Sequence, residues 1–461
     1  MTETKTARRT IPWWGKLLLL FFGICFFVVL ELALEFFNCG DNVDLFIPRE
    51  TYEENRVMTW NAGYHQRAFN YIYPLYYYLQ PFNREASWGL EMQHEFLTEK
   101  PEDGLRVFLM GSSSVRGYPL GRGYAFGTIL EKMLNRAAPD RVVEVINPTD
   151  DAMSSTMVRR LFDESVDYEP DVMVFYLGHN EFYGVCGVGS TMLPGMWGWP
   201  GVVFTWLQKT RLYRLMKNTH REVMFRLGDL RAKMLGHQGR EPDKPVSLID
   251  NLPGVKNISP ANRLSRAATT RFRNNLEHMV KTSLDRGITV VLMTVDSTLK
   301  NLYPLGSQPE KEIPAATRKQ WKKLFENGRR FLAEDQVLAA DDNLRQAAEL
   351  APLHAETWYL WGLACHKLGR TGEGLKYLRR SRDLDRVPFR ARSDINAVIR
   401  ALAEKYSDNK KLLFIDTEHL FARNSTGGVT GADLFLEHVH FTFKGKFLVA
   451  REILNVLGQS G

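Results

Sequence analysis

The chain has 461 residues, of which 25% are charged and 44% are hydrophobic, and its formal net charge is +7. This length allows one large domain with an additional module, or two domains, and the composition is ordinary for a globular protein. So mild a charge does not indicate nucleic-acid binding, and four scattered cysteines without a CxxC pair argue against a zinc module or a disulfide framework.

Residues 1–38 are predicted to be a cytoplasmic tail and a transmembrane anchor. The stretch 17–34 is apolar except for Glu31, which is long enough to span a bilayer. Basic residues precede it and acidic residues follow it, so the N-terminus should lie in the cytoplasm and the rest outside. Trp13 and Trp14 lie where interfacial side chains are expected. A cleaved signal peptide is the alternative, but no clear A-x-A site follows the apolar stretch.

Residues 39–104 form an N-terminal arm that precedes the main domain. Its most conspicuous stretch, FNYIYPLYYYL, is aromatic. It is either a strand or an extended segment that packs on the domain, and the sequence leaves both alternatives open.

Beyond this arm, short apolar runs alternate with longer helical patterns. The runs LRVFLMG, VVEVIN, DVMVFYLG, GITVVLMTV and KLLFID are typical of buried strands in a parallel sheet. Helical patterns lie between them, at about 123–137, 154–168 and 264–286. This alternation predicts a three-layer α/β/α domain with a flavodoxin-like parallel sheet, formed by residues 105–320 together with 389–461.

One interruption of this alternation lies within residues 190–250. An apolar stretch that contains Trp197, Trp199 and Trp206 leads into a basic segment, 209–244, with ten Lys or Arg residues against four acidic ones. This composition suits a partly buried helical insertion with a solvated basic face. It also suits a lid that faces an anionic membrane surface.

The other interruption, residues 321–388, contains a repeat with a spacing of 34 residues. Gly328 matches Gly362 at this spacing, and Leu344 matches Leu378. The period resembles that of tetratricopeptide repeats, each of which consists of two antiparallel helices. About three such repeats are usually needed for independent folding, so we expect these two to pack on the α/β domain or on a partner protein.

Three polar blocks are candidates for a catalytic site. GSSSVRG follows the first predicted strand, YLGHNEFYG follows the third, and FLEHVHFTFKGK lies near the C-terminus. A serine nucleophile needs a base, a group that orients the base, and donors for an oxyanion. Each block alone has an ordinary structural explanation, such as a turn or a helix cap, but their order and their places after strands favour a site.

Together the blocks resemble the signature blocks of the SGNH (GDSL-type) hydrolases, and are most similar to membrane-anchored members that carry tetratricopeptide repeats. The resemblance implies a serine esterase that needs no metal or organic cofactor. Ser113 would be the nucleophile, His440 its base, and Glu437 the residue that orients the base. Asn180, the N–H of Ser113 and an N–H from Thr149 would donate to the oxyanion.

The resemblance covers about residues 105–300 and 410–457, and the chain departs from the family pattern at three positions. Ser112 and Glu437 each replace a usual aspartate, and Thr149 replaces a usual glycine.

Three nearby residues keep more than one interpretation. His438 is an alternative base. Asp150 and Asp151 are either solvated loop residues or contacts to the substrate.

We therefore predict a single-pass protein of the bacterial cytoplasmic (inner) membrane with an extracytoplasmic catalytic domain. Acyl transfer through a Ser113 acyl-enzyme would end on water in an esterase, or on a sugar hydroxyl in an O-acyltransferase. The location favours a cell-envelope glycan or lipid as the acyl-ester substrate. The alternative is a catalytically inactive scaffold of the same fold whose repeats bind an envelope partner.

Overall fold

The computed structural model describes residues 12–37, 39, 46–50, 56–60, 95–189, 257–309 and 313–459, and within the segment 207–227 it describes 207, 210–216, 219, 220, 223, 226 and 227. The chain divides into two compact units. The first contains the N-terminal helix and the segment 207–227, and the second contains the other elements. The stretch FNYIYPLYYYL and the three tryptophans Trp197, Trp199 and Trp206 lie outside the described residues.

The second unit is built on a parallel sheet of five strands, which confirms the predicted fold class. In spatial order the strands are β5 (Val143–Ile146), β4 (Leu105–Gly111), β6 (Val172–Tyr176), β7 (Thr289–Met293) and β8 (Leu412–Ile415). This is the doubly wound order of flavodoxin-like sheets, in which the direction of winding reverses between the first and third strands along the chain. Here that switch point lies between β4 and β6.

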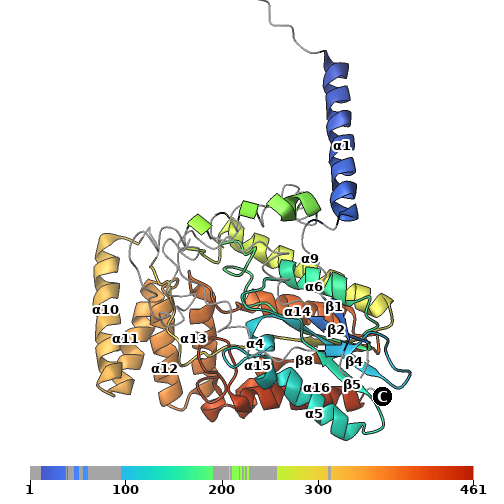
Figure 1. The fold of residues 1–461 in the computed structure, drawn as a ribbon. Coiled ribbons are helices and arrows are strands. Elements are labelled where there is room, and N and C mark those ends of the chain that lie inside the picture. Colours follow the sequence, from blue (N-terminus) through green and yellow to red (C-terminus); the bar gives the residue numbers. More distant parts are fainter. Residues whose placement is uncertain are drawn as a thin grey trace, which may run out of the picture. The chain divides into compact units, whose positions relative to one another are not determined.

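Helices cover both faces of this sheet (Figure 1). One face carries α5 (Phe126–Ala137) and α16 (Phe443–Gln459), and the other carries α6 (Ser155–Ser165), α9 (Arg263–Asp285) and α14 (Ser393–Lys405). Because both faces are covered, consecutive residues of β4 are buried rather than alternate ones: Val107, Phe108, Leu109 and Met110 are all fully inaccessible. This explains why the strands are continuous apolar runs in the sequence.

The N-terminal arm contributes a small antiparallel sheet that the sequence did not predict. It consists of β1 (Phe46–Glu50), β2 (Arg56–Trp60) and β3 (Glu95–Leu97). Phe46 and Phe96 pack edge to face, and both rings contact Phe108 of the main sheet and Tyr168. The remaining short elements of this unit are α4 (Ser113–Arg116), η1 (Arg122–Tyr124), α15 (Thr417–Asn424) and η2 (Thr426–Gly428).

Four helices are inserted between β7 and β8, as the repeat predicted. They are α10 (Ala315–Ala333), α11 (Val337–Leu350), α12 (Ala355–Lys367) and α13 (Thr371–Leu384). The pairs α10–α11 and α12–α13 pack as hairpins. A Cβ at Gly328 would lie 2.5 Å from Leu344 Cγ, and a Cβ at Gly362 would lie 2.7 Å from Leu378 Cγ. The two matching glycines therefore mark the close contacts within the two hairpins.

This helical module packs on the α/β domain through a buried ion pair. Arg382 of α13 is 1% exposed, and its Nη1 donates to Glu418 of α15 at 3.3 Å. Its Nη2 donates to the Ser393 hydroxyl at 2.8 Å, and Arg400 of α14 donates to Glu418 at 2.7 Å. Two hairpins that cannot bury enough surface alone are thus joined to the domain.

The first unit contains α1 (Trp13–Phe36), whose 24 residues include the predicted span. Its mean hydropathy over an 18-residue window reaches 2.8, and none of its residues is buried. By length and composition it is able to cross a membrane.

Replacing Gly362 by alanine tests the close contact between α12 and α13. The new Cβ would lie 3.0 Å from the backbone nitrogen of Leu378 and 3.1 Å from the oxygen of Gly374, and the helices would have to separate, at a cost of about 1–3 kcal/mol. Gly372→Ala is the matched control, because nothing lies within 4 Å of that position. Hydrogen exchange of the α12 and α13 amides measures the loss of protection in each variant. Equal protection in Gly362→Ala and Gly372→Ala would contradict this packing.

Candidate active site

A small pocket lies at the carboxyl ends of β4 and β6, at the switch point where ligands of doubly wound folds bind. Its walls come from the two loops that follow these strands: Ser112, Ser113, Ser114, Tyr176, Leu177, Gly178, His179 and Asn180. Two of the three predicted blocks therefore meet here.

The turn after β4 is shaped by a glycine on each side. A Cβ at Gly111 would lie 2.4 Å from the carbonyl oxygen of Tyr176, so only glycine allows β4 and β6 to approach so closely. Gly117 ends the short helix α4 with φ of 101°, a conformation that favours glycine. Between them, Ser112, Ser113 and Ser114 are all nearly buried.

The three serines differ in what their hydroxyls bind. Ser112 Oγ donates to the Asp150 carbonyl at 3.0 Å, and accepts from Met153 N–H at 2.8 Å and from Asn180 Nδ2 at 2.9 Å. Its one proton and two lone pairs are thus all used. Ser114 Oγ donates to the Val439 carbonyl at 3.0 Å. The Ser113 hydroxyl makes no hydrogen bond with any residue that the structure describes.

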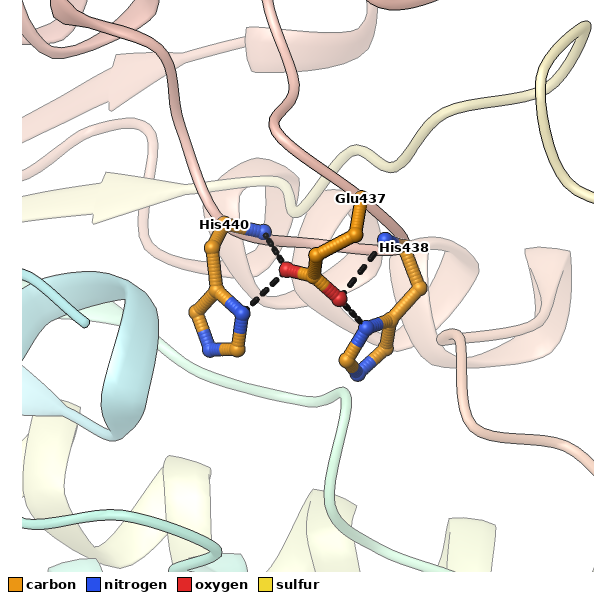
Figure 2. Close-up of side chains that lie close together, drawn as sticks. All are labelled: Glu437, His438 and His440. Atoms are coloured by element: carbon orange, nitrogen blue, oxygen red, sulfur yellow. Dashed lines mark hydrogen bonds and ion pairs between the residues drawn. The ribbon is translucent and has the colours of Figure 1, made fainter. Parts of the chain in front are cut away.

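The C-terminal block forms a tight loop centred on Glu437 (Figure 2). Its Oε1 accepts the backbone N–H of His440 at 3.0 Å and also contacts His440 Nδ1. Its Oε2 accepts the backbone N–H of His438 at 2.8 Å and contacts His438 Nδ1. The longer glutamate side chain is therefore accommodated by folding back onto its own loop, and it leaves His440 Nε2 on the far side of the ring.

The loop of His440 contacts the serine turn. Besides the bond from Ser114 to the Val439 carbonyl, the ring of Tyr118 lies 4.5 Å from the ring of His440. Lys446 Nζ lies 3.4 Å from the carbonyl of Gly117. His440 Nε2 is buried and has no hydrogen-bond partner among the described residues. All three polar blocks thus meet at one end of the sheet.

Asn180 and Thr149, two of the predicted oxyanion donors, differ in how their N–H groups are already bonded. One N–H of Asn180 holds Ser112 Oγ, which fixes the amide and leaves its second N–H. The Thr149 N–H, however, donates to Asn147 Oδ1 at 3.3 Å, and the Thr149 hydroxyl donates to the same oxygen at 2.6 Å. Both donors of Thr149 are thus engaged by one oxygen of its own loop.

Burial keeps the histidines of this site neutral. It lowers the pKa of His440 to about 4, although the negative charge of Asp151 raises it. Burial and the neighbouring His440 lower the pKa of His438 to about 3, and burial lowers the pKa of His179 well below its usual range. Since protonation begins only well below pH 6.5, His440 is a neutral imidazole at pH 7 and is able to accept a proton.

Asp150 and Asp151 are not simply solvated loop residues. Arg116, the last residue of α4, lies 2.5 Å from an oxygen of Asp151 and 3.5 Å from an oxygen of Asp150. Burial raises the pKa of Asp151, and Arg116 opposes that effect. The pair therefore joins the loop after β5 to the serine turn.

Two residues of the GHNE stretch have positioning roles that the sequence did not assign. Glu181 is fully buried and accepts the N–H of Ser155 at 2.6 Å and its hydroxyl at 2.8 Å, at the start of α6. His179 Nδ1 accepts the N–H of Ala391 at 3.1 Å. The sequence signal was the stretch itself, in which these polar residues flank Asn180 directly after a buried strand.

A metal-ligand geometry is present at the same loop. Among the described residues, Glu437, His438 and His440 place one ligand atom each within 4.8 Å of one another. The Glu437 carboxylate oxygens contact the Nδ1 atoms of both rings, and the contact with His440 is a hydrogen bond.

Comparison with known proteins gives a distant structural likeness. No family model matches the chain, and no curated protein matches it. A putative lipolytic protein of the G-D-S-L family from Desulfitobacterium hafniense DCB-2 is 10% identical, covering 76% of this chain and 98% of its own, with a TM-score of 0.30. The lipase/acylhydrolase from Enterococcus faecalis is 13% identical, covering 76% and 95%, with a TM-score of 0.31.

A variant of an acetyl xylan esterase from Geobacillus stearothermophilus is similar to the same degree, at 13% identity, 78% and 97% coverage, and a TM-score of 0.32. At these TM-scores the likeness carries no argument about activity, which rests on the residues of this chain.

Replacing Ser112 by alanine tests its connecting role. The change removes three hydrogen bonds, one of them from the buried N–H of Met153, and a buried donor that loses its acceptor costs about 1–3 kcal/mol. Ser114→Ala is the control, since it removes one bond and should cost about 1 kcal/mol. The opening free energy of the Met153 amide in hydrogen exchange measures the difference. Equal losses would mean that Ser112 does not hold these loops.

Proposed function

We propose that the chain is a serine hydrolase that cleaves acyl esters through an acyl-enzyme on Ser113. The observation that carries the proposal is the contrast among the three serines. Ser112 has a saturated hydroxyl and Ser114 donates to a carbonyl, whereas the Ser113 hydroxyl lacks a partner among the described residues. It also belongs to the pocket that Asn180 lines.

His440 is the proposed general base. Its Nδ1 contacts Glu437, which selects the tautomer whose Nε2 is free to accept a proton. Nε2 is buried, unpartnered among the described residues, and carried by the loop that contacts the serine turn. Glu437 would then stabilise the imidazolium that forms when Ser113 attacks the ester carbonyl.

The oxyanion would be bound by two donors. The N–H of Ser113 is at the start of α4, where helical N–H groups have no intrahelical acceptor, and the second N–H of Asn180 adds a side-chain donor. An oxyanion donor of this kind contributes about 10²–10³ in rate. We leave Thr149 out of this set, because its N–H is engaged by Asn147.

The location and the substrate are part of the proposal. We propose that α1 anchors the chain in a bacterial inner membrane, with the N-terminus in the cytoplasm, because basic residues precede the span and acidic residues follow it. An anchored domain on the outer side favours an ester on an envelope glycan or lipid. If a sugar hydroxyl replaces water as the acyl acceptor, the same site is an O-acyltransferase.

The helical module is proposed to be of the tetratricopeptide type, and to bind a protein partner on the surface that it does not bury against the α/β domain. The spacing of 34 residues and the two tight hairpins support this assignment.

Hydrolysis of p-nitrophenyl acetate by the full-length protein tests the nucleophile. Ser113→Ala should reduce kcat by about 10³-fold or more, and His440→Ala should cost nearly as much, because the members of a triad act as a unit. Glu437→Gln should cost less, since it removes only the orienting charge. Ser114→Ala is the comparison variant: it removes only the bond to the Val439 carbonyl and should lower kcat far less than Ser113→Ala.

Loss of activity in Ser114→Ala but not in Ser113→Ala would place the nucleophile on the other serine. A wild-type protein that is folded but inactive on all short and long acyl esters would favour the scaffold alternative.

A further inference from the structure

In the first unit, α1 is joined to the basic segment 207–227 through Glu31, the only charged residue within the apolar stretch 17–34. Glu31 Oε2 accepts the N–H of Arg211 at 2.8 Å, and Oε1 accepts the N–H of Leu212 at 2.8 Å. The guanidinium of Arg211 also donates to the carbonyl of Cys39 at 3.3 Å. The segment therefore contacts one residue inside α1, Glu31, and one just beyond its end, Cys39.

The position of Glu31 sets the depth of this contact. Glu31 lies five residues before the end of α1 at Phe36, which is about 7 Å along the axis at a rise of about 1.5 Å per residue. With α1 across a bilayer, the start of the helical residues 211–216 would lie at the boundary between headgroups and hydrocarbon. Surface helices bury their apolar faces about 5–10 Å into that boundary. The distance of Glu31 from the end of α1 lies within this range.

The contact also gives Glu31 the hydrogen-bond partners that a carboxylate in a membrane span needs. A carboxylate within a membrane span is unfavourable unless it has hydrogen-bond or charged partners. Two backbone N–H groups of the segment supply partners to Glu31. The polar residue in the span and the helix beside it therefore stabilise each other.

Apolar side chains of the segment are exposed on one side. Met216, Val223 and Leu227 are 65%, 49% and 54% exposed, and all three are in helical conformation. Spacings of seven and four residues are those that the helical period repeats on one face. The surrounding sequence, 209–244, has ten Lys or Arg residues and four acidic ones, so the exposed apolar face belongs to a cationic segment.

We propose that the segment 207–227 is a membrane-surface element that binds an anionic phospholipid bilayer beside its own transmembrane helix. Met216, Val223 and Leu227 enter the acyl boundary, and the positive charge of the segment attracts the anionic headgroups. Glu31 fixes this element to the span. This role rests on the proposed anchoring by α1 and not on the proposed hydrolase activity, so a loss of ester hydrolysis would leave it standing.

The test uses the full-length protein in vesicles of zwitterionic and anionic phospholipid at about 3:1, with Cys25, Cys39, Cys186 and Cys365 replaced by serine. Single cysteines carry an environment-sensitive NBD label at Met216→Cys, at Val29→Cys in α1 and at Leu338→Cys in α11. Val29 and Leu338 are 65% and 75% exposed, and they are the membrane and water controls.

We expect the label at position 216 to be blue-shifted and quenched by a phospholipid that carries a nitroxide near its headgroup. The label at position 29 should be quenched by a nitroxide deep in the acyl chain, and the label at position 338 by neither. A label at 216 that behaves like the one at 338 would overturn the proposal and favour a protein partner or a second copy on this face. An unquenched label at position 29 would overturn it as well, because α1 would not be inserted.

A second variant tests the role of Glu31. Glu31→Leu removes both acceptors, so quenching at position 216 should fall, and fall further at high salt, where screening weakens the remaining attraction of the basic residues. Glu31→Gln is the control, because it keeps one acceptor oxygen and should retain most of the quenching. Unchanged quenching in Glu31→Leu would show that Glu31 does not hold the element.

Discussion

The hydroxyl of Ser112 is the interaction on which the candidate site depends. One oxygen joins the loops after three strands, because it donates to Asp150 and accepts from Met153 and Asn180. A hydroxyl has no further capacity for hydrogen bonds, so Ser112 is a connecting residue and its neighbour Ser113 is left to react. The same bond fixes the amide of Asn180 before any substrate arrives, which is the preorganisation that oxyanion stabilisation requires.

The remaining parts of the site are attached to this centre by short local contacts. The loop of Glu437 and His440 is stabilised from within, since the carboxylate binds backbone N–H groups three residues or fewer away. Ser114 then joins that loop to the serine turn. Burial keeps the imidazole of His440 neutral, and the charge of Asp151 partly offsets that effect, so the loop after β5 also influences the proposed base.

The sequence predicted the features that depend on local pattern. All five strands were predicted, because a sheet covered on both faces needs uninterrupted runs of branched apolar residues, as in β4 and β6. The contact between Glu437 and His440 was predictable because the two residues are three positions apart. The close contacts at Gly328 and Gly362 followed from the repeat.

Features that depend on distant contacts were not predicted. The connecting role of Ser112 was not predicted, because its partners lie 38 to 68 positions away and a serine hydroxyl has no sequence signal of its own. The small sheet of the arm pairs β3 with β2 across a long stretch of sequence, from Trp60 to Glu95. Thr149 was expected to donate to the oxyanion, and the competing acceptor on Asn147 became evident only in the structure.

A crystal structure of the protein after reaction with an alkyl phosphonate ester tests the central claim most directly. The account predicts a phosphorus bonded to Ser113 Oγ, with a phosphonyl oxygen about 2.7–3.1 Å from both the Ser113 N–H nitrogen and Asn180 Nδ2. It also predicts that Ser112 Oγ keeps its three partners. An adduct on Ser112 or Ser114, or a phosphonyl oxygen directed away from Asn180, would contradict the account.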